Sequence, residues 1–167
     1  PRLVVRIYKS LRQPEDAWRN YGKNSKSMRG ELVKEVTFKM NLANSYTEAD
    51  STLAIPMDRL GLYEYVITVP GKQLTASNRF SVSRLAALTR SQTNNPEVLV
   101  TDLESGKPIE GATVIYYKTN MMNGTIQRQG EVKTDQLGIA ILPAKKKIEH
   151  IRPVLREDSS SIITNIY

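Results

Sequence analysis

TDLESGKPIEGATV, residues 101–114, is the stretch on which the fold assignment depends. It has two possible interpretations. The stretch places two glycines and a proline between apolar runs, so it either cradles a ligand or turns the chain from one strand into the next. A phosphate cradle requires a glycine loop that opens a helix, so that amide dipoles point at the anion. The run that follows, ATVIYY, is instead β-branched and aromatic. We therefore interpret the stretch as a connection between strands.

The residue types in this connection suit a tight turn. Gly106 supplies a positive φ at little steric cost, and Pro108 fixes its own φ at about −65°. A second turn, TDQLG at 134–138, follows the same logic, with an aspartate that caps the turn and a glycine in the left-handed position. From these two turns we predict five structural turn residues: Gly106, Pro108, Gly111, Asp135 and Gly138.

Short apolar and β-branched runs recur along the whole chain, with turn residues between them. They lie at 3–8, 31–42, 51–57, 63–69 and 79–88, and then at 97–103, 112–119, 125–134, 138–144, 151–157 and 161–167. The polar, proline-ended SQTNNP at 91–96 is the best candidate for a boundary between the two series. We predict an all-β chain of two consecutive antiparallel β-sandwich domains, residues 1–92 and 93–167.

Composition excludes several kinds of site. Because the chain has no cysteine, it cannot form disulfides, thiolate metal sites or a cysteine nucleophile. No apolar run approaches the roughly 18 residues that a membrane-spanning helix needs, so we predict no transmembrane segment. The chain begins without Met, inside what reads as a strand, and we expect it to be an excerpt of a longer protein.

The net charge of +7 is concentrated in the first predicted domain. Residues 1–92 carry 15 Lys and Arg against 8 Asp and Glu, whereas residues 93–167 carry 9 of each. Much of the excess lies in a long basic loop at residues 9–30. The loop lacks the aromatic signatures of the common RNA-binding sheets, so we expect no nucleic-acid partner. It is either a solvated loop or an interaction surface formed by Arg12, Trp18, Arg19, Tyr21, Lys23 and Lys26.

No pattern in the sequence indicates catalysis, a cofactor or a metal ion. The single histidine, His150, is expected at a strand edge, and no G-x-S-x-G motif supports a serine triad. Glu157 and Asp158 are adjacent, so on a strand they would point to opposite faces. Oxygen ligands for calcium are present in the turns, but turn geometry calls for the same residues, Asp102, Glu104 and Asp135. Asn123-Gly124-Thr125 matches a glycosylation acceptor and is also a hairpin signal.

The combination VTDLESGKPIEGATV and GEVKTDQLGIAILP resembles the macroglobulin domains of bacterial alpha-2-macroglobulins. These often read V-x-D-x-x-T-G-x-P-x-x-G-A-x-V, followed by a T-D-x-x-G turn and a strand that ends in Pro. GLYEYVITVPG and NRFSVSRLAAL resemble the close of a preceding domain, and RPVLREDSSSIITNIY resembles the last strands of such a domain. The resemblance covers residues 60–167. Similar turn pairs occur in carboxypeptidase-regulatory-like domains, but the order of two consecutive modules favours the macroglobulin family.

The resemblance implies a very large exported protein of many such domains, located in the periplasm or at the outer surface, that traps proteases after they cleave a bait segment. Many members attach covalently through a thioester of a Cys and a Gln. This chain has no Cys, so the resemblance implies a non-catalytic scaffold whose partners are neighbouring macroglobulin domains and, for the parent, proteases. An adhesin-like or carbohydrate-binding pair of sandwiches is the alternative, based on exposure of Trp18, Tyr21, Tyr116 and Tyr117.

Overall fold

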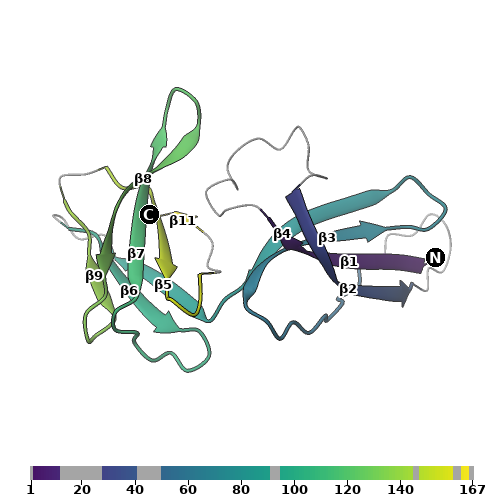
Figure 1. Cartoon of the computed structure of the whole chain (residues 1–167), viewed down its shortest axis with the longest axis horizontal. Coiled ribbons are helices and arrows are strands. Elements are labelled where there is room, and N and C mark those ends of the chain that lie inside the picture. Colours follow the sequence, from purple (N-terminus) through teal and green to yellow (C-terminus); the bar gives the residue numbers. More distant parts are fainter. Residues whose placement is uncertain are drawn as a thin grey trace.

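The computed structural model describes residues 2–11, 28–40, 50–90, 95–144, 147–159 and 163–165. Within these residues the chain forms eleven β-strands and no α-helix, and neighbouring strands are antiparallel. Figure 1 shows a first group of strands, β1 to β4, connected to a second group, β5 to β11. The predicted all-β class with antiparallel sheets is confirmed.

The first sheet has the strand order β2-β1-β3-β4. Its strands are β1 (Arg2–Ser10), β2 (Arg29–Lys39), β3 (Gly61–Thr68) and β4 (Thr75–Val82). One face of the sheet is apolar because alternate residues of neighbouring strands share a face: Val5 lies opposite Ile67, and Ile7 opposite Tyr65. Val5 and Ile7 are buried together with Tyr63, and this small core defines the inner side of the sheet.

Residues 51–57, here called the covering segment, lie against this apolar face without joining the sheet. Leu53, Ile55 and Met57 pack on the core at alternate positions, while Thr52 and Ala54 are exposed. The prediction of a ladder strand at 51–57 is therefore wrong. Alternation of apolar residues indicates that one face of a segment is buried. It does not indicate that the segment is hydrogen-bonded to a neighbouring strand.

The link between the two groups lies at Ser83 and Arg84. The sequence indicates one continuous strand at 79–88, but β5 (Leu85–Arg90) pairs along its length with β6 (Glu97–Asp102) of the second group. The strand is interrupted where the Ser83 hydroxyl accepts a hydrogen bond from the N–H of Leu85 at 3.1 Å. Sheet membership thus changes upstream of SQTNNP, of which residues 91–94 lie outside the described residues.

A buried carboxylate holds this link in place. Asp158 Oδ2 accepts hydrogen bonds from Ser83 Oγ at 2.9 Å and from the N–H of Arg84 at 2.7 Å. Asp158 is 2% exposed, so both bonds are shielded from water. Hydrogen bonds to a charged acceptor are stronger than neutral ones, and the link is therefore anchored to the second group.

The second group is a β-sandwich of two sheets with the strand orders β11-β10-β7-β8 and β5-β6-β9. The strands not yet given are β7 (Thr113–Asn120), β8 (Thr125–Lys133), β9 (Ile139–Ile141), β10 (His150–Val154) and β11 (Thr164–Asn165). Val98 and Val100 of β6 meet Val114 of β7 and Ile151 of β10 in a core from which solvent is excluded. Among the described residues this core has more buried members than that of the first sheet.

Candidate interaction site

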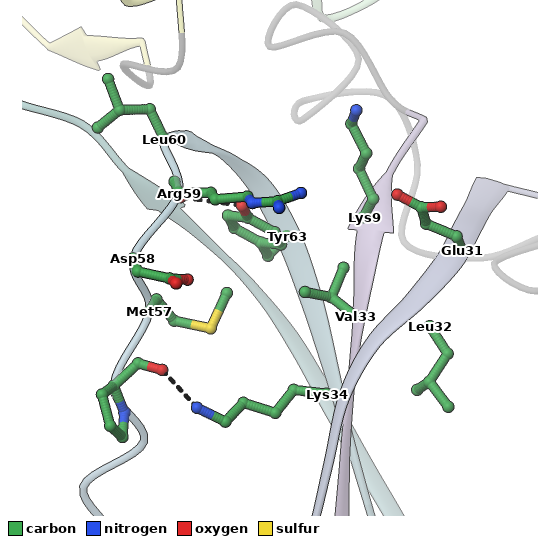
Figure 2. A pocket seen from close by; sticks show the side chains of 11 residues that line it. Lys9, Glu31, Leu32, Val33, Lys34, Met57, Asp58, Arg59, Leu60 and Tyr63 are labelled. Atoms are coloured by element: carbon green, nitrogen blue, oxygen red, sulfur yellow. Dashed lines mark hydrogen bonds between the residues drawn. The ribbon is translucent and has the colours of Figure 1, made fainter.

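A groove of about 520 Å³ opens at the end of the first sheet where β1 finishes and β2 begins. Figure 2 shows its walls: β2 on one side and the chain that leads into β3 on the other. Its lining residues are Lys9 of β1, residues 31–34 of β2, residues 56–60, and Tyr63 of β3.

Two hydrogen bonds fix the walls of this groove. Lys34 Nζ donates to the carbonyl oxygen of Pro56 at 2.7 Å, which ties β2 to the end of the covering segment. Tyr63 Oη donates to the carbonyl oxygen of Arg59 at 2.9 Å. The Tyr63 ring stacks on Phe80 with centroids 5.5 Å apart, so the core of the sheet holds this donor in position.

The lining of the groove combines charges of both signs with apolar side chains. Lys9 and Arg59 extend toward the mouth from opposite sides, while Val33 and Met57 point inward (Figure 2). Because Glu31 and Asp58 line the groove together with the cations, the groove does not present the positive potential that attracts an anion. A mixture of apolar and charged side chains is typical of protein contact surfaces.

The groove lies at the base of the predicted basic loop. The N–H of Leu11 donates to the carbonyl oxygen of Met28 at 3.0 Å, and this bond closes the two ends of the loop on each other. The residues predicted as its interaction surface lie outside the described residues: Arg12, Trp18, Arg19, Tyr21, Lys23 and Lys26. Only the ends of the loop are therefore placed beside the groove.

A partly buried ion pair, in which the carboxylate is the buried partner, anchors the start of β2 on the opposite face of the sheet. Arg29 Nε donates to Glu64 Oε1 at 2.7 Å, and the guanidinium carbon lies 5.7 Å from the ring centroid of Tyr8. Tyr8 and Glu64 are directly opposite each other in the β1–β3 ladder. Sequence reasoning missed this pair. Its signal was the single acidic residue within the apolar run LYEYVIT, because a buried carboxylate requires a partner.

The two predicted turns pack against each other. Thr134, which is buried, donates its hydroxyl to the carbonyl oxygen of Ile109 at 2.6 Å and accepts the N–H of Ala112 at 2.9 Å. Gly138 has a φ of 73°, and a Cβ there would lie 2.7 Å from the carbonyl oxygen of Val100. The stretch 101–114 is thus a strand connection that docks on the TDQLG turn.

The other predicted turn residues also take part in turns or in their hydrogen bonds. Gly106 and Gly111 have φ values of 68° and 75°, and Pro108 forms an isolated bridge with Thr101. Asp135 Oδ1 accepts the N–H groups of Leu137 and Ile139, both at 2.9 Å. This carboxylate therefore serves the backbone of its own turn.

Asp102 also acts as a turn acceptor. Its Oδ1 accepts the N–H and the hydroxyl of Ser105, each at 2.8 Å, and the N–H bond is the main cause that lowers the pKa of Asp102. Glu104 is exposed in the same turn. Across the described residues no cluster of three His, Cys, Asp or Glu side chains could hold a metal ion.

Two tyrosines assigned to an exposed surface are buried. Tyr116 and Tyr117 are 6% and 0% exposed, so both faces of β7 are covered at this point. A β-bulge lies between them, because Tyr116 pairs with Gly130 and Tyr117 with Arg128. The carbohydrate-binding alternative therefore loses two of its four aromatics. Trp18 and Tyr21 lie outside the described residues.

His150 is not at a strand edge. It begins β10, which lies between β7 and β11, and its Nε2 is 2.9 Å from Thr119 Oγ1. The neighbouring Glu149 accepts the N–H of Thr119 at 2.6 Å, and this bond, followed by one from Lys147, lowers the pKa of Glu149 to about 2. The histidine is thus a buried residue of the sheet, and its Nε2 is engaged by a threonine hydroxyl of the neighbouring strand β7.

The remaining sequence motifs have structural positions. Glu157 is exposed while Asp158 is buried at the link, so the two carboxylates do not face one substrate. Gly124, with a φ of 64°, closes the β7–β8 hairpin by donating its N–H to the carbonyl oxygen of Asn120 at 2.8 Å. In the part of the chain that the structure describes, no helix has the length and hydropathy to cross a membrane.

No family model and no curated protein matches this chain. Two solved fragments of native alpha-2-macroglobulin from Escherichia coli are similar to it. The fragment that spans domains NIE-MG1 aligns with 99% of this chain and 83% of its own length, at 18% identity and a TM-score of 0.71. The fragment that spans MG0-NIE-MG1 aligns with 99% of this chain and 55% of its own length, at 17% identity and a TM-score of 0.72. The chain therefore has the fold of these macroglobulin fragments, as the sequence resemblance predicts.

Proposed function

We propose that this chain is a non-catalytic structural and interaction segment of a large exported bacterial protein of the alpha-2-macroglobulin type, whose parent inhibits endopeptidases by trapping them. One observation carries the proposal. The alignment with the NIE-MG1 fragment runs over 99% of the chain at a TM-score of 0.71, so it follows two consecutive domains of one protein and not a single sandwich. Many unrelated proteins share one sandwich, but a shared order of two domains is more specific.

We assign the two domains by this order. The first sheet with its covering segment is proposed as the counterpart of NIE, and the sandwich of β5 to β11 as the counterpart of MG1. We place the boundary at Ser83 and Arg84, where sheet membership changes, instead of at residue 92. The groove beside Lys9 and Arg59 is then a contact surface for a neighbouring domain or for the trapped protease.

The parent reading frame provides the first test. A secretory or lipoprotein signal upstream and a series of further sandwich domains downstream are expected, with or without a Cys and Gln pair for a thioester. Cell fractionation should then place the protein in the periplasm or at the outer surface. A complete reading frame of about the length of this chain would contradict the proposal.

Protease trapping has a kinetic signature that a simple active-site inhibitor lacks. A trapped protease is enclosed but its active site is free, so cleavage of a folded protein substrate should fall while cleavage of a short peptide substrate continues. The full-length parent should produce this split with several proteases of different mechanism. Equal loss of both activities, or no loss of either, would contradict a trap.

A further inference from the structure

The apolar face of the first sheet is incompletely filled by the covering segment. A second groove of about 250 Å³ remains between them. Val5, Ile7, Ile67 and Phe80 line it from the sheet, and Leu53 and Ile55 line it from the covering segment. Val5 and Ile7 are buried while Leu53 and Ile55 remain half-exposed. The groove therefore has room for further apolar side chains. A sheet normally buries its apolar face against another layer, so we expect this room to be filled.

The backbone of the covering segment is also open to pairing. It belongs to no β-ladder, and the hydrogen bond found for it among the described residues is the one from Lys34 Nζ to the carbonyl oxygen of Pro56. Each residue from Thr52 to Ile55 has an N–H and a C=O group, and an unpaired row of such groups is a template for another strand. Pro56 ends the row because it has no N–H.

The covering segment lacks the features that protect the sheet edge beside it. β2 carries Lys34, Glu35 and Lys39, and its register with β1 is interrupted after Ile7. Charges and bulges of this kind prevent an edge from pairing with another strand. The sequence STLAI of residues 51–55 has no charge and no glycine, and it alternates small exposed residues with aliphatic ones.

We propose that residues 52–55 are a docking edge for an extended strand from a neighbouring domain of the same longer polypeptide. Main-chain hydrogen bonds give such a strand its affinity, and the groove of about 250 Å³ takes its alternate apolar side chains. The inference rests on the proposed function, which supplies the neighbour. One solved fragment of the Escherichia coli protein spans domains named MG0-NIE-MG1, and we assign the strand to the domain that would take the position of MG0 in this order.

Photocrosslinking in the full-length parent tests which segment occupies this edge. Ala54, which is exposed, is replaced by p-benzoylphenylalanine, and crosslinked peptides are identified by mass spectrometry. The expected product joins residues 50–60 to a segment of the domain that precedes residue 1. The same replacement at Gln73, in the exposed turn between β3 and β4, is the matched control and should give no such product.

Hydrogen exchange of the same protein tests the backbone pairing. The amides of Thr52 and Ala54, which point to the same side of an extended segment, should exchange about 100-fold more slowly than that of Gln73, because local opening would first have to release the docked strand. Ala54→Pro removes one of these two donors and should abolish the protection of Thr52, whereas Ala54→Ser keeps the donor and should retain it. Ala54→Lys, which leaves the backbone unconstrained, should weaken docking by charge and serves if the proline variant does not fold.

The possible outcomes distinguish failure of the docking inference from failure of the proposed function. A peptide map that shows no domain outside residues 1–167 rejects the proposed function and the inference together. If neighbouring domains are present, fast exchange at residues 52 and 54 rejects the inference alone. A crosslink within residues 1–167, or to a separate protein, likewise rejects the assignment of the strand to a neighbouring domain.

Discussion

Replacing Gly138 by alanine should cost much more stability than replacing Gly106, although both glycines have a positive φ. The φ values are 73° and 68°, so the penalty for a left-handed alanine, about 1–2 kcal/mol, is common to both. A Cβ at Gly106 meets no heavy atom within 4 Å. At Gly138 it meets the carbonyl oxygen of Val100 at 2.7 Å, Pro108 Cβ at 3.0 Å and the N–H nitrogen of Ile109 at 3.1 Å.

These neighbours cannot move aside easily because the backbone around them is hydrogen-bonded. The N–H of Val100 donates to the carbonyl oxygen of Gly138 at 2.8 Å, and the N–H of Ile109 donates to that of Val100 at 3.0 Å. Overpacking at such a site costs about 1–3 kcal/mol. Gly106→Ala should therefore destabilise the protein by about 1–2 kcal/mol, and Gly138→Ala by about 2–5 kcal/mol.

Urea denaturation followed by far-UV circular dichroism gives both values from the midpoints at an unchanged slope. Alanine affects the unfolded chain equally in both variants. This effect therefore cancels when the loss in free energy of unfolding at Gly106 is subtracted from that at Gly138. Equal losses within about 0.5 kcal/mol would refute the close packing of the two turns. A loss at Gly106 larger than at Gly138 would refute the assignment of Gly106 to an open turn.

Three further predictions concern buried or hydrogen-bonded charges. Asp158→Ala should lower the free energy of unfolding by about 2–4 kcal/mol in urea denaturation, because two donors at the link lose a charged acceptor; a loss below about 0.5 kcal/mol would contradict this. Arg29→Ala should cost about 2–4 kcal/mol and the double variant with Glu64→Leu should recover part of it, which a double-mutant cycle measures. The folded pKa of Glu149 is about 2 against an ordinary value of 4.5, so its stabilisation is present above about pH 4.5 and is lost as the pH falls through about 2. Calorimetry over this range should show a steeper fall in Tm for the wild type than for Glu149→Gln, and parallel profiles would contradict it.

The local turns follow from the sequence because their chemistry is local. The position of Gly106 in a turn requires only the dihedral freedom of glycine, and Asp135 needs only the N–H groups of its own turn. The packing of Gly138 against Val100 was not predictable in the same way. It depends on a contact between residues far apart in the chain.

Strand partners were harder to predict because alternation does not specify them. Apolar alternation indicates strands at 51–57 and at 79–88, but the first remains outside the ladder and the second divides between two sheets. The candidate site was the least predictable part of the structure. The basic loop beside it could be predicted from the distribution of charged residues in the sequence. The groove beside Lys9 and the Arg29–Glu64 pair could not, because they form only when β1, β2 and β3 are in register.

The bond between Ser83 and Asp158 has a consequence for the order in which the protein is completed on the ribosome. The two residues are separated by 75 positions, while the strands of the first sheet all lie before Ser83. At a synthesis rate of about 5–20 residues per second, Asp158 follows Ser83 by roughly 4–15 seconds. The first sheet can therefore close while the connection behind it still lacks its acceptor, and this connection becomes anchored to the second group only near the end of this stretch of translation.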